Sequence, residues 1–204
     1  MPDYRRAREP GGTFFLTLVT CGRAPLFNDS NARRCLHDAV AQVRRDRPFE
    51  LSAMVLLPEH LHLILTLPAD DADFSIRVAA IKARFTRAWL SHPPAGADSE
   101  GCGSAGRPIE QPQSRSRQRQ GYRGVWQKRF WEHWIRDESD RERSIDYIHF
   151  NPVKHGHIAC PHAWPWTTFH RFVAERRYDA DWRCACAGST HPPSPPDVPG
   201  AEME

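Results

Sequence analysis

Residues 56–67 read LLPEHLHLILTL and decide the fold. Pro58 and Glu59 separate two apolar runs, residues 49–57 and residues 60–67. The runs are close enough in sequence to pair as an antiparallel hairpin. Side chains alternate between the two faces of a strand. The second strand therefore has an unbroken apolar face that must pack on helices, formed by Leu61, Leu63, Leu65 and Leu67. Its other face carries His60, His62, Ile64 and Thr66.

Local patterns predict further elements on both sides of this hairpin. Residues 14–20 are rich in β-forming side chains and predict a first strand. Cap residues precede apolar positions at helical spacing over residues 30–46, and Asp73 can cap a second helix that runs to about residue 90. A fourth strand is expected at about residues 130–136.

A third helix is expected over residues 138–151. Pro152 should end or kink it, because proline lacks the amide hydrogen, and Gly156 can terminate it. The aromatic stretch 163–172 could pack back on the domain.

The predicted order is β-α-β-β-α-β-α. This is an α+β fold of the ferredoxin-like split βαβ type: a four-stranded antiparallel sheet, two helices on one face, and an additional C-terminal helix. We expect an N-terminal arm at residues 1–12, one domain at residues 13–172, and a mostly disordered tail at residues 173–204. A Pro/Gly/Ser/Arg/Gln-rich insert at about residues 91–124 has too few apolar side chains to join a core.

Composition narrows the class of protein. A chain of 204 residues fits about one domain. The N-terminus has no apolar signal segment, and no run of apolar residues is long enough to span a membrane. The six cysteines show no regular disulfide framework, so we expect a cytoplasmic protein that needs no disulfide.

The charge is unevenly distributed. The net charge is only +3, but residues 107–136 hold eight Lys or Arg against two Glu, so the rest of the chain is net negative. A basic segment with interleaved aromatic residues is typical of nucleic-acid binding. A solvated charged loop is the alternative.

Two motifs could carry chemistry. On a strand, the Cβ atoms of His60 and His62 should lie about 6–7 Å apart on one face, so both rings could bind one divalent cation. Two solvated histidines are the alternative. Tyr147 and Asn151 are four residues apart, so they share one helix face, where they could also be an ordinary surface pair.

Taken together, the motifs resemble a known family. LLPEHLHLIL (56–65), WQKRFWEHWIRDESDRERSIDYIHFNPVKHGHI (126–158) and WPWTTFHRF (164–172) are similar to the single-tyrosine HUH transposases, and within them to the REP-associated tyrosine transposases. The resemblance implies that His60, His62 and Asn151 hold Mg²⁺ or Mn²⁺. It implies that Tyr147 is the nucleophile that cuts single-stranded DNA at hairpin repeats through a 5′-phosphotyrosine, in a monomer or a homodimer.

DNA contacts are expected from basic side chains and from stacking tryptophans, Trp126 and Trp131 among them. The basic candidates are Arg33, Arg34, Lys82, Arg84, Arg87, Arg123, Lys128 and Arg129.

Glu59 departs from the family pattern, in which asparagine often precedes the first histidine, and its role is open. Three other functions compete with the transposase. One is a nuclease that activates water with the same metal. Another is a non-catalytic ferredoxin-like module that binds nucleic acid. The third is a zinc protein that draws on Cys160, His157, His162, Cys184 and Cys186.

Overall fold

The computed structural model describes residues 7–91 and 124–184, and a four-stranded sheet lies at its centre. The strands are β1 (Thr13–Val19), β2 (Glu50–Leu56), β3 (His60–Thr66) and β4 (Trp131–Ile135). They pair in the order β2-β3-β1-β4, with every neighbouring pair antiparallel. This confirms the predicted ferredoxin-like sheet.

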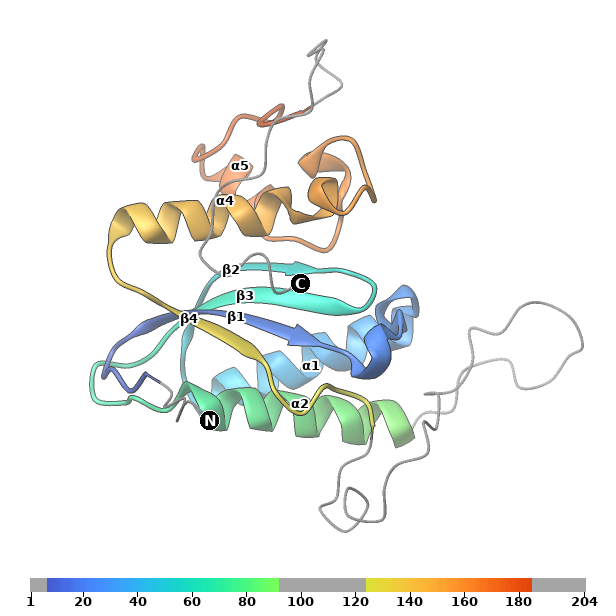
Figure 1. Cartoon of the computed structure of the whole chain (residues 1–204), viewed down its shortest axis with the longest axis vertical. Coiled ribbons are helices and arrows are strands. Elements are labelled where there is room, and N and C mark those ends of the chain that lie inside the picture. The colour runs from blue at the N-terminus through green and yellow to red at the C-terminus, as the bar shows by residue number, and fades with distance from the viewer. Residues whose placement is uncertain (1–6, 92–123, 185–204) are drawn as a thin grey trace, which may run out of the picture.

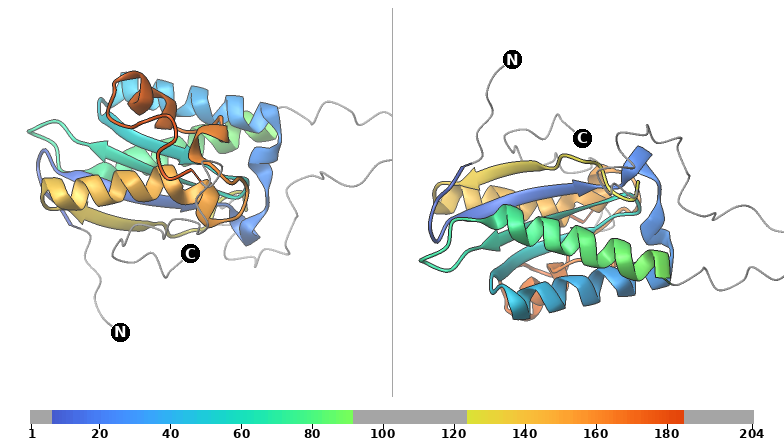
Figure 2. Two further views of the ribbon diagram at one scale, coloured as in Figure 1. Left: turned by 90° about the horizontal axis from the view of Figure 1, so that it is seen from above. Right: turned by 90° about the horizontal axis from the view of Figure 1, so that it is seen from below.

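Two helices cover one face of the sheet, α1 (Ser30–Asp46) and α2 (Phe74–Ser91), as Figure 1 and the right-hand view of Figure 2 show. Asp29 caps α1 by accepting from two backbone amides, and Asp73 accepts from Ile76 N at the start of α2. The main core lies between these helices and the sheet. The four leucines of the predicted apolar face are all part of it: Leu61, Leu63, Leu65 and Leu67.

A third helix, α4 (Glu138–Lys154), lies across the opposite face of the sheet (Figure 1). Ile145 and Ile148 pack there against Phe15 of β1 and Ile64 of β3 in a second core. The predicted end of this helix at residue 151 is wrong, because α4 continues through Pro152 to Lys154. Proline removes a single hydrogen bond, and the last turn is kept by the His155 amide, which donates to Asn151 O at 3.0 Å. Gly156 then adopts a φ of 70°, as a terminating glycine should.

The C-terminal segment packs further along the chain than predicted. The short helices η3 (Pro161–Ala163) and α5 (Phe169–Ala174) follow α4 and bury Phe169 and Phe172. Beyond residue 172, Tyr178 stacks on Trp182 and its hydroxyl donates to Asp146 of α4. The predicted domain boundary at residue 172 is therefore too early, because aromatic burial continues past it.

The N-terminal arm is also partly packed. The Gly11 amide donates to Pro68 O and Asp71 O, each at 3.1 Å, and Ala7 contacts the main core. Gly12 fits because a Cβ there would meet the Phe14 ring at 2.9 Å. The first six residues, most of the predicted insert (92–123) and the rest of the predicted tail (185–204) lie outside the described residues.

Cys160 and Cys184 form a disulfide, although the sequence analysis expected a protein that needs none. The two cysteines are 24 positions apart, and only the return of the chain across α4 brings them together. Among the described residues, no helix is long and apolar enough to cross a membrane.

We predict that Phe172→Ala destabilises the protein by about 3–5 kcal/mol, because the ring is 1% exposed and its loss leaves a cavity against His149 and Tyr178. Urea unfolding measures the change. The control is Ile76→Ala, which removes a side chain that is 43% exposed and should cost under about 1 kcal/mol. Equal losses for the two variants would show that the C-terminal segment adds no stability.

Candidate active site

Strand β3 presents its two histidines to the face that α4 covers. His62 lies opposite Thr17 of β1, and His60 opposite Val19. Both imidazoles are buried, and their ring centroids are 4.8 Å apart. The two histidines therefore lie together on the face opposite the leucines, as the strand pattern predicts.

Glu59 holds the ring of His60. Its carboxylate lies 2.9 Å from His60 Nδ1, and since a carboxylate only accepts, Nδ1 donates. This hydrogen bond is the main cause of the lowered pKa of Glu59, so the carboxylate stays ionised. With Nδ1 protonated, the neutral ring has its lone pair on Nε2. That atom is buried and has no hydrogen-bond partner among the described residues.

Thr17 plays the corresponding part for the second histidine. Its hydroxyl lies 2.9 Å from His62 Nδ1, and the Phe15 ring lies 5.4 Å from the imidazole. Each histidine thus has its Nδ1 anchored to a neighbour on the sheet. This arrangement orients both rings and is common around histidines that bind metals.

Helix α4 brings Tyr147 onto His62 and buries Asn151 one turn further along. The Tyr147 ring stands edge-on to His62, with centroids 5.6 Å apart, and to Phe15 at 6.0 Å. Asn151 is fully buried one turn later, and neither atom of its side-chain amide has a hydrogen-bond partner among the described residues. The structure therefore places Tyr147 beside the two histidines and buries Asn151 on the same helix, while their roles in catalysis and metal binding stay a prediction.

Lys154 is a site residue that the sequence analysis missed. Its ammonium donates to the Tyr147 hydroxyl at 2.7 Å and lies 4.7 Å from the centre of the same ring. The sequence spacing does place Lys154 with the site, because Tyr147, Asn151 and Lys154 are at positions i, i+4 and i+7 of one helix face. A cation at the hydroxyl favours the ionised, nucleophilic form of a tyrosine.

His155 adds a third imidazole beside the pair. It follows α4 directly, and its ring centroid lies 5.2 Å from that of His60. Its charge contributes to the lowered pKa of Glu59. The sequence analysis did not single out this residue.

The site residues fit a divalent metal. Burying a nitrogen lone pair and an amide oxygen without a partner costs free energy, which a bound cation would offset. The His60 Nε2 atom and the Asn151 Oδ1 atom are two such groups. Imidazole nitrogen and amide oxygen are both ligands of Mn²⁺, and the oxygen suits Mg²⁺ as well.

Helices α1 and α2, which carry several of the predicted DNA contacts, lie on the opposite side of the sheet from α4 (Figure 2). Arg33 donates to two backbone carbonyls near the start of α1 and stacks on Trp166, so it has a structural role. Arg34 donates to Asn31. The contacts of both arginines are therefore with residues outside the candidate active site.

The remaining basic candidates are scattered. Lys82 donates to Gln127 O, and Arg84 pairs with Asp46. Lys128 and Arg129 are exposed, as is Arg87, whereas Arg123 lies outside the described residues. Their contacts with DNA stay a prediction.

One stacking candidate has another role. Trp126 is buried in the main core against Phe27 and Phe85, so it does not offer a free face to a base. Trp131 is partly buried and stands edge-on to Phe15, on the side of the sheet where Tyr147 lies.

Comparisons with known proteins agree with this geometry. No protein-family model matches the chain. The REP-associated tyrosine transposase of Escherichia coli (strain K12) is 40% identical over 182 residues, which cover 89% of this chain and 91% of that protein. A relative in Haemophilus influenzae with the same family name is 36% identical over 183 residues, covering 89% of this chain and 93% of its own length.

A solved structure is also similar. It is described as a REP-associated tyrosine transposase bound to a REP hairpin, and it is 38% identical to this chain with a TM-score of 0.69. The match covers 97% of this chain and 98% of the solved one. With this identity over nearly its whole length, the chain belongs to the family of REP-associated tyrosine transposases.

Proposed function

We propose that this transposase cuts and rejoins single-stranded DNA at REP hairpins, with Tyr147 as its nucleophile. The observation that carries the proposal is the packing of Tyr147 against His62, with Asn151 one helical turn away and Lys154 at the hydroxyl. The hairpin is the ligand named for the solved relative. Because the proposed substrate is DNA, we place the protein in the cytoplasm.

His60, His62 and Asn151 would hold Mg²⁺ or Mn²⁺. Such a cation polarises a scissile phosphate and neutralises the charge that develops on it. Glu59 and Thr17 keep the two imidazoles turned toward the site through their Nδ1 hydrogen bonds. Asn151, fully buried, adds an amide oxygen from the helix.

The chain's own residues then perform the transfer. Lys154 supports ionisation of the Tyr147 hydroxyl, whose proton passes to solvent, and solvent supplies the proton that the leaving oxygen later takes up. The tyrosine oxygen bonds to phosphorus, the bond from phosphorus to the 3′ oxygen breaks, and that oxygen takes up a proton as a free 3′-hydroxyl. The 5′-phosphotyrosine conserves the energy of the broken bond, so a second 3′-hydroxyl can reverse the step and join strands.

A DNA phosphate needs an opening to reach this site. Tyr147 is 2% exposed, and the two histidines and Asn151 are no more than 1% exposed. Entry therefore requires groups above the sheet to move. Such a step would exclude water from the reaction when the site closes again, which protects the covalent link from hydrolysis.

We predict that Tyr147→Phe abolishes DNA cleavage and covalent adduct formation but keeps the fold and hairpin affinity, because only the hydroxyl is lost. Wild-type protein incubated with single-stranded hairpin DNA and Mn²⁺ should give a denaturant-resistant adduct that peptide mapping places on Tyr147. Tyr178→Phe is the control, since the Tyr178 hydroxyl donates to Asp146 and not to a residue of the candidate active site.

Two outcomes would contradict this role of Tyr147. Strong cleavage by the Phe variant would favour the nuclease that activates water. Tight hairpin binding without metal, cleavage or adduct would favour the non-catalytic module.

We predict that Glu59→Ala lowers Mn²⁺ affinity about 10- to 100-fold, the usual effect of losing a group that orients a ligating histidine. His60→Ala should remove most of the affinity and the cleavage, while hairpin binding persists. Calorimetric titration with Mn²⁺ measures the metal affinity of both variants. Asp70→Ala, at an exposed carboxylate, controls for the change of charge. Unchanged affinity in both Glu59→Ala and His60→Ala would place the metal elsewhere.

We predict that Lys154→Met slows single-turnover cleavage by about 100-fold or more, because the ammonium at the Tyr147 oxygen is lost. Hairpin affinity should change little. Lys128→Met, which removes an exposed charge, separates this effect from general loss of DNA attraction. If Lys154→Met instead weakened hairpin binding and left the cleavage rate intact, Lys154 would be a phosphate contact.

A further inference from the structure

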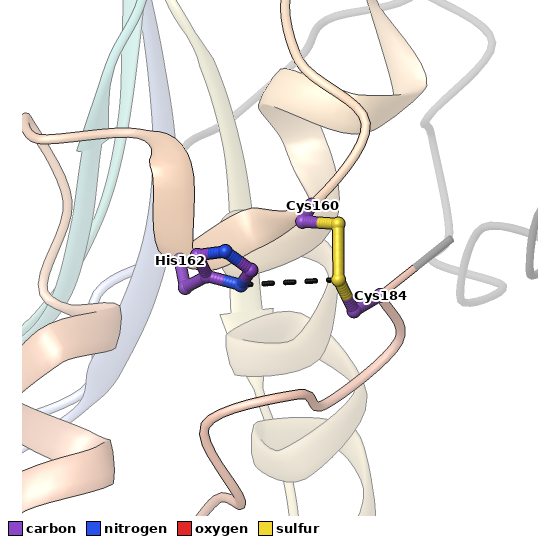
Figure 3. Close-up of side chains that lie close together, drawn as sticks. All are labelled: Cys160, His162 and Cys184. Atoms are coloured by element: carbon purple, nitrogen blue, oxygen red, sulfur yellow. Dashed lines mark hydrogen bonds between the residues drawn. A yellow bond between two sulfur atoms is a disulfide. The ribbon is translucent and has the colours of Figure 1, made fainter. Parts of the chain in front are cut away.

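A second cluster of metal-binding side chains lies outside the active site, where the chain returns across α4. It consists of Cys160, His162 and Cys184, which Figure 3 shows together. Cys160 lies between α4 and η3, His162 is in η3, and Cys184 ends the described C-terminal segment. One ligand atom of each lies within 4.8 Å of the other two.

We propose that Cys160, His162 and Cys184 form a zinc site when the two cysteines are reduced. Thiolate and imidazole are the ligands that zinc prefers in proteins, and a water would complete the tetrahedral set beside two thiolates and one imidazole. In a tetrahedral centre with ordinary zinc–ligand bonds, a sulfur and a nitrogen lie about 3.5 Å apart and two sulfurs about 3.8 Å apart. His162 Nδ1 and Cys184 Sγ are 3.8 Å apart, so this pair needs little adjustment.

The position of His162 is what favours a metal over a simple disulfide. A disulfide between Cys160 and Cys184 does not require an imidazole, yet His162 Nδ1 is held in a hydrogen bond with the Cys184 sulfur (Figure 3). The two sulfurs are buried while His162 is exposed. A cation could therefore enter from the solvent side through the histidine.

Reduction converts the disulfide form into the form that binds zinc. A dithiol reductant supplies two electrons and two protons, which turn the Cys160–Cys184 disulfide into two thiols. Zn²⁺ then displaces the two thiol protons and binds both thiolates and the neutral imidazole. The sequence offers Cys186 as a further thiol, but it lies outside the described residues and the proposal does not depend on it.

The site would fasten the C-terminal segment to the end of α4. Between Cys160 and Cys184 the chain forms α5 and the stacked pair Tyr178 and Trp182, which pack around His149 of α4. A zinc bound at the two ends of this loop would hold it closed, as the disulfide does in the oxidised form. The helix it braces carries the proposed nucleophile.

The test uses the full chain with the active-site metal ligands removed, His60→Ala/His62→Ala, reduced with a phosphine and stripped of metal. Titration with Co²⁺ should give the sulfur-to-metal charge-transfer absorption of a thiolate centre, and Zn²⁺ should displace it at one equivalent per chain. Cys160→Ser, His162→Ala and Cys184→Ser should each weaken Zn²⁺ binding by more than about 100-fold, which exceeds the effect of an outer-shell change. Cys21→Ser is the control for an unrelated free thiol.

His162→Ala is the decisive variant, because the exposed side chain can be removed without disturbing the core or the disulfide. Zn²⁺ should raise the melting temperature of the reduced host protein and of Cys21→Ser, but not of His162→Ala. Absence of a thiolate charge-transfer band in the reduced host would overturn the proposal. So would a zinc affinity that His162→Ala leaves unchanged. Neither result bears on Tyr147, whose chemistry is tested separately.

Discussion

The two-residue period of β3 is the constraint on which the rest of the structure depends. Leu61, Leu63 and Leu65 are each no more than 1% exposed, and burying each contributes about 1.5–3 kcal/mol. Sliding the strand by one residue would turn the leucines away from α1 and α2 and press two imidazoles into an apolar core. The main core therefore fixes the histidines on the opposite face before any functional contact is made.

That opposite face is itself apolar beside the histidines, and it has to be covered. Ile145 and Ile148 dock α4 on it against Phe15 and Ile64. Once those contacts set the rotation of the helix, Tyr147 lies beside His62, and Asn151 lies one turn further along the same helix face. The candidate active site is thus formed by two cores on the two sides of one sheet, with α4 supplying the groups that β3 lacks.

Period and spacing were enough to predict the sheet and both flanking helices, whereas the meeting of Tyr147 with the histidines was implied by the family resemblance. They failed where a partner lies far away in sequence. The Cys160–Cys184 bond and the packing of Tyr178 depend on the path of the chain after α4, which no local pattern encodes. The sequence does place Lys154 on the face of Tyr147, but Pro152 suggested that the helix had already ended. The hydrogen bond that fixes the role of Glu59 needs a side-chain rotamer, which sequence does not give.

The segment after α4 limits how freely that helix can move. Burial lowers the pKa of His149 to about 3, so the ring stays neutral and shares a hydrogen bond with Thr168, whose hydroxyl also meets the backbone of β2. Tyr178 donates to Asp146 of α4, and its ring packs against His149 on the same side of the helix. A nucleophile has to be held close to its productive geometry by rigid support. The proposed entry of DNA requires the site to open. When it opens, the contacts of α4 with the C-terminal segment must either move together with the helix or break. The disulfide between Cys160 and Cys184 ties that segment to the end of α4 and favours movement of the two together.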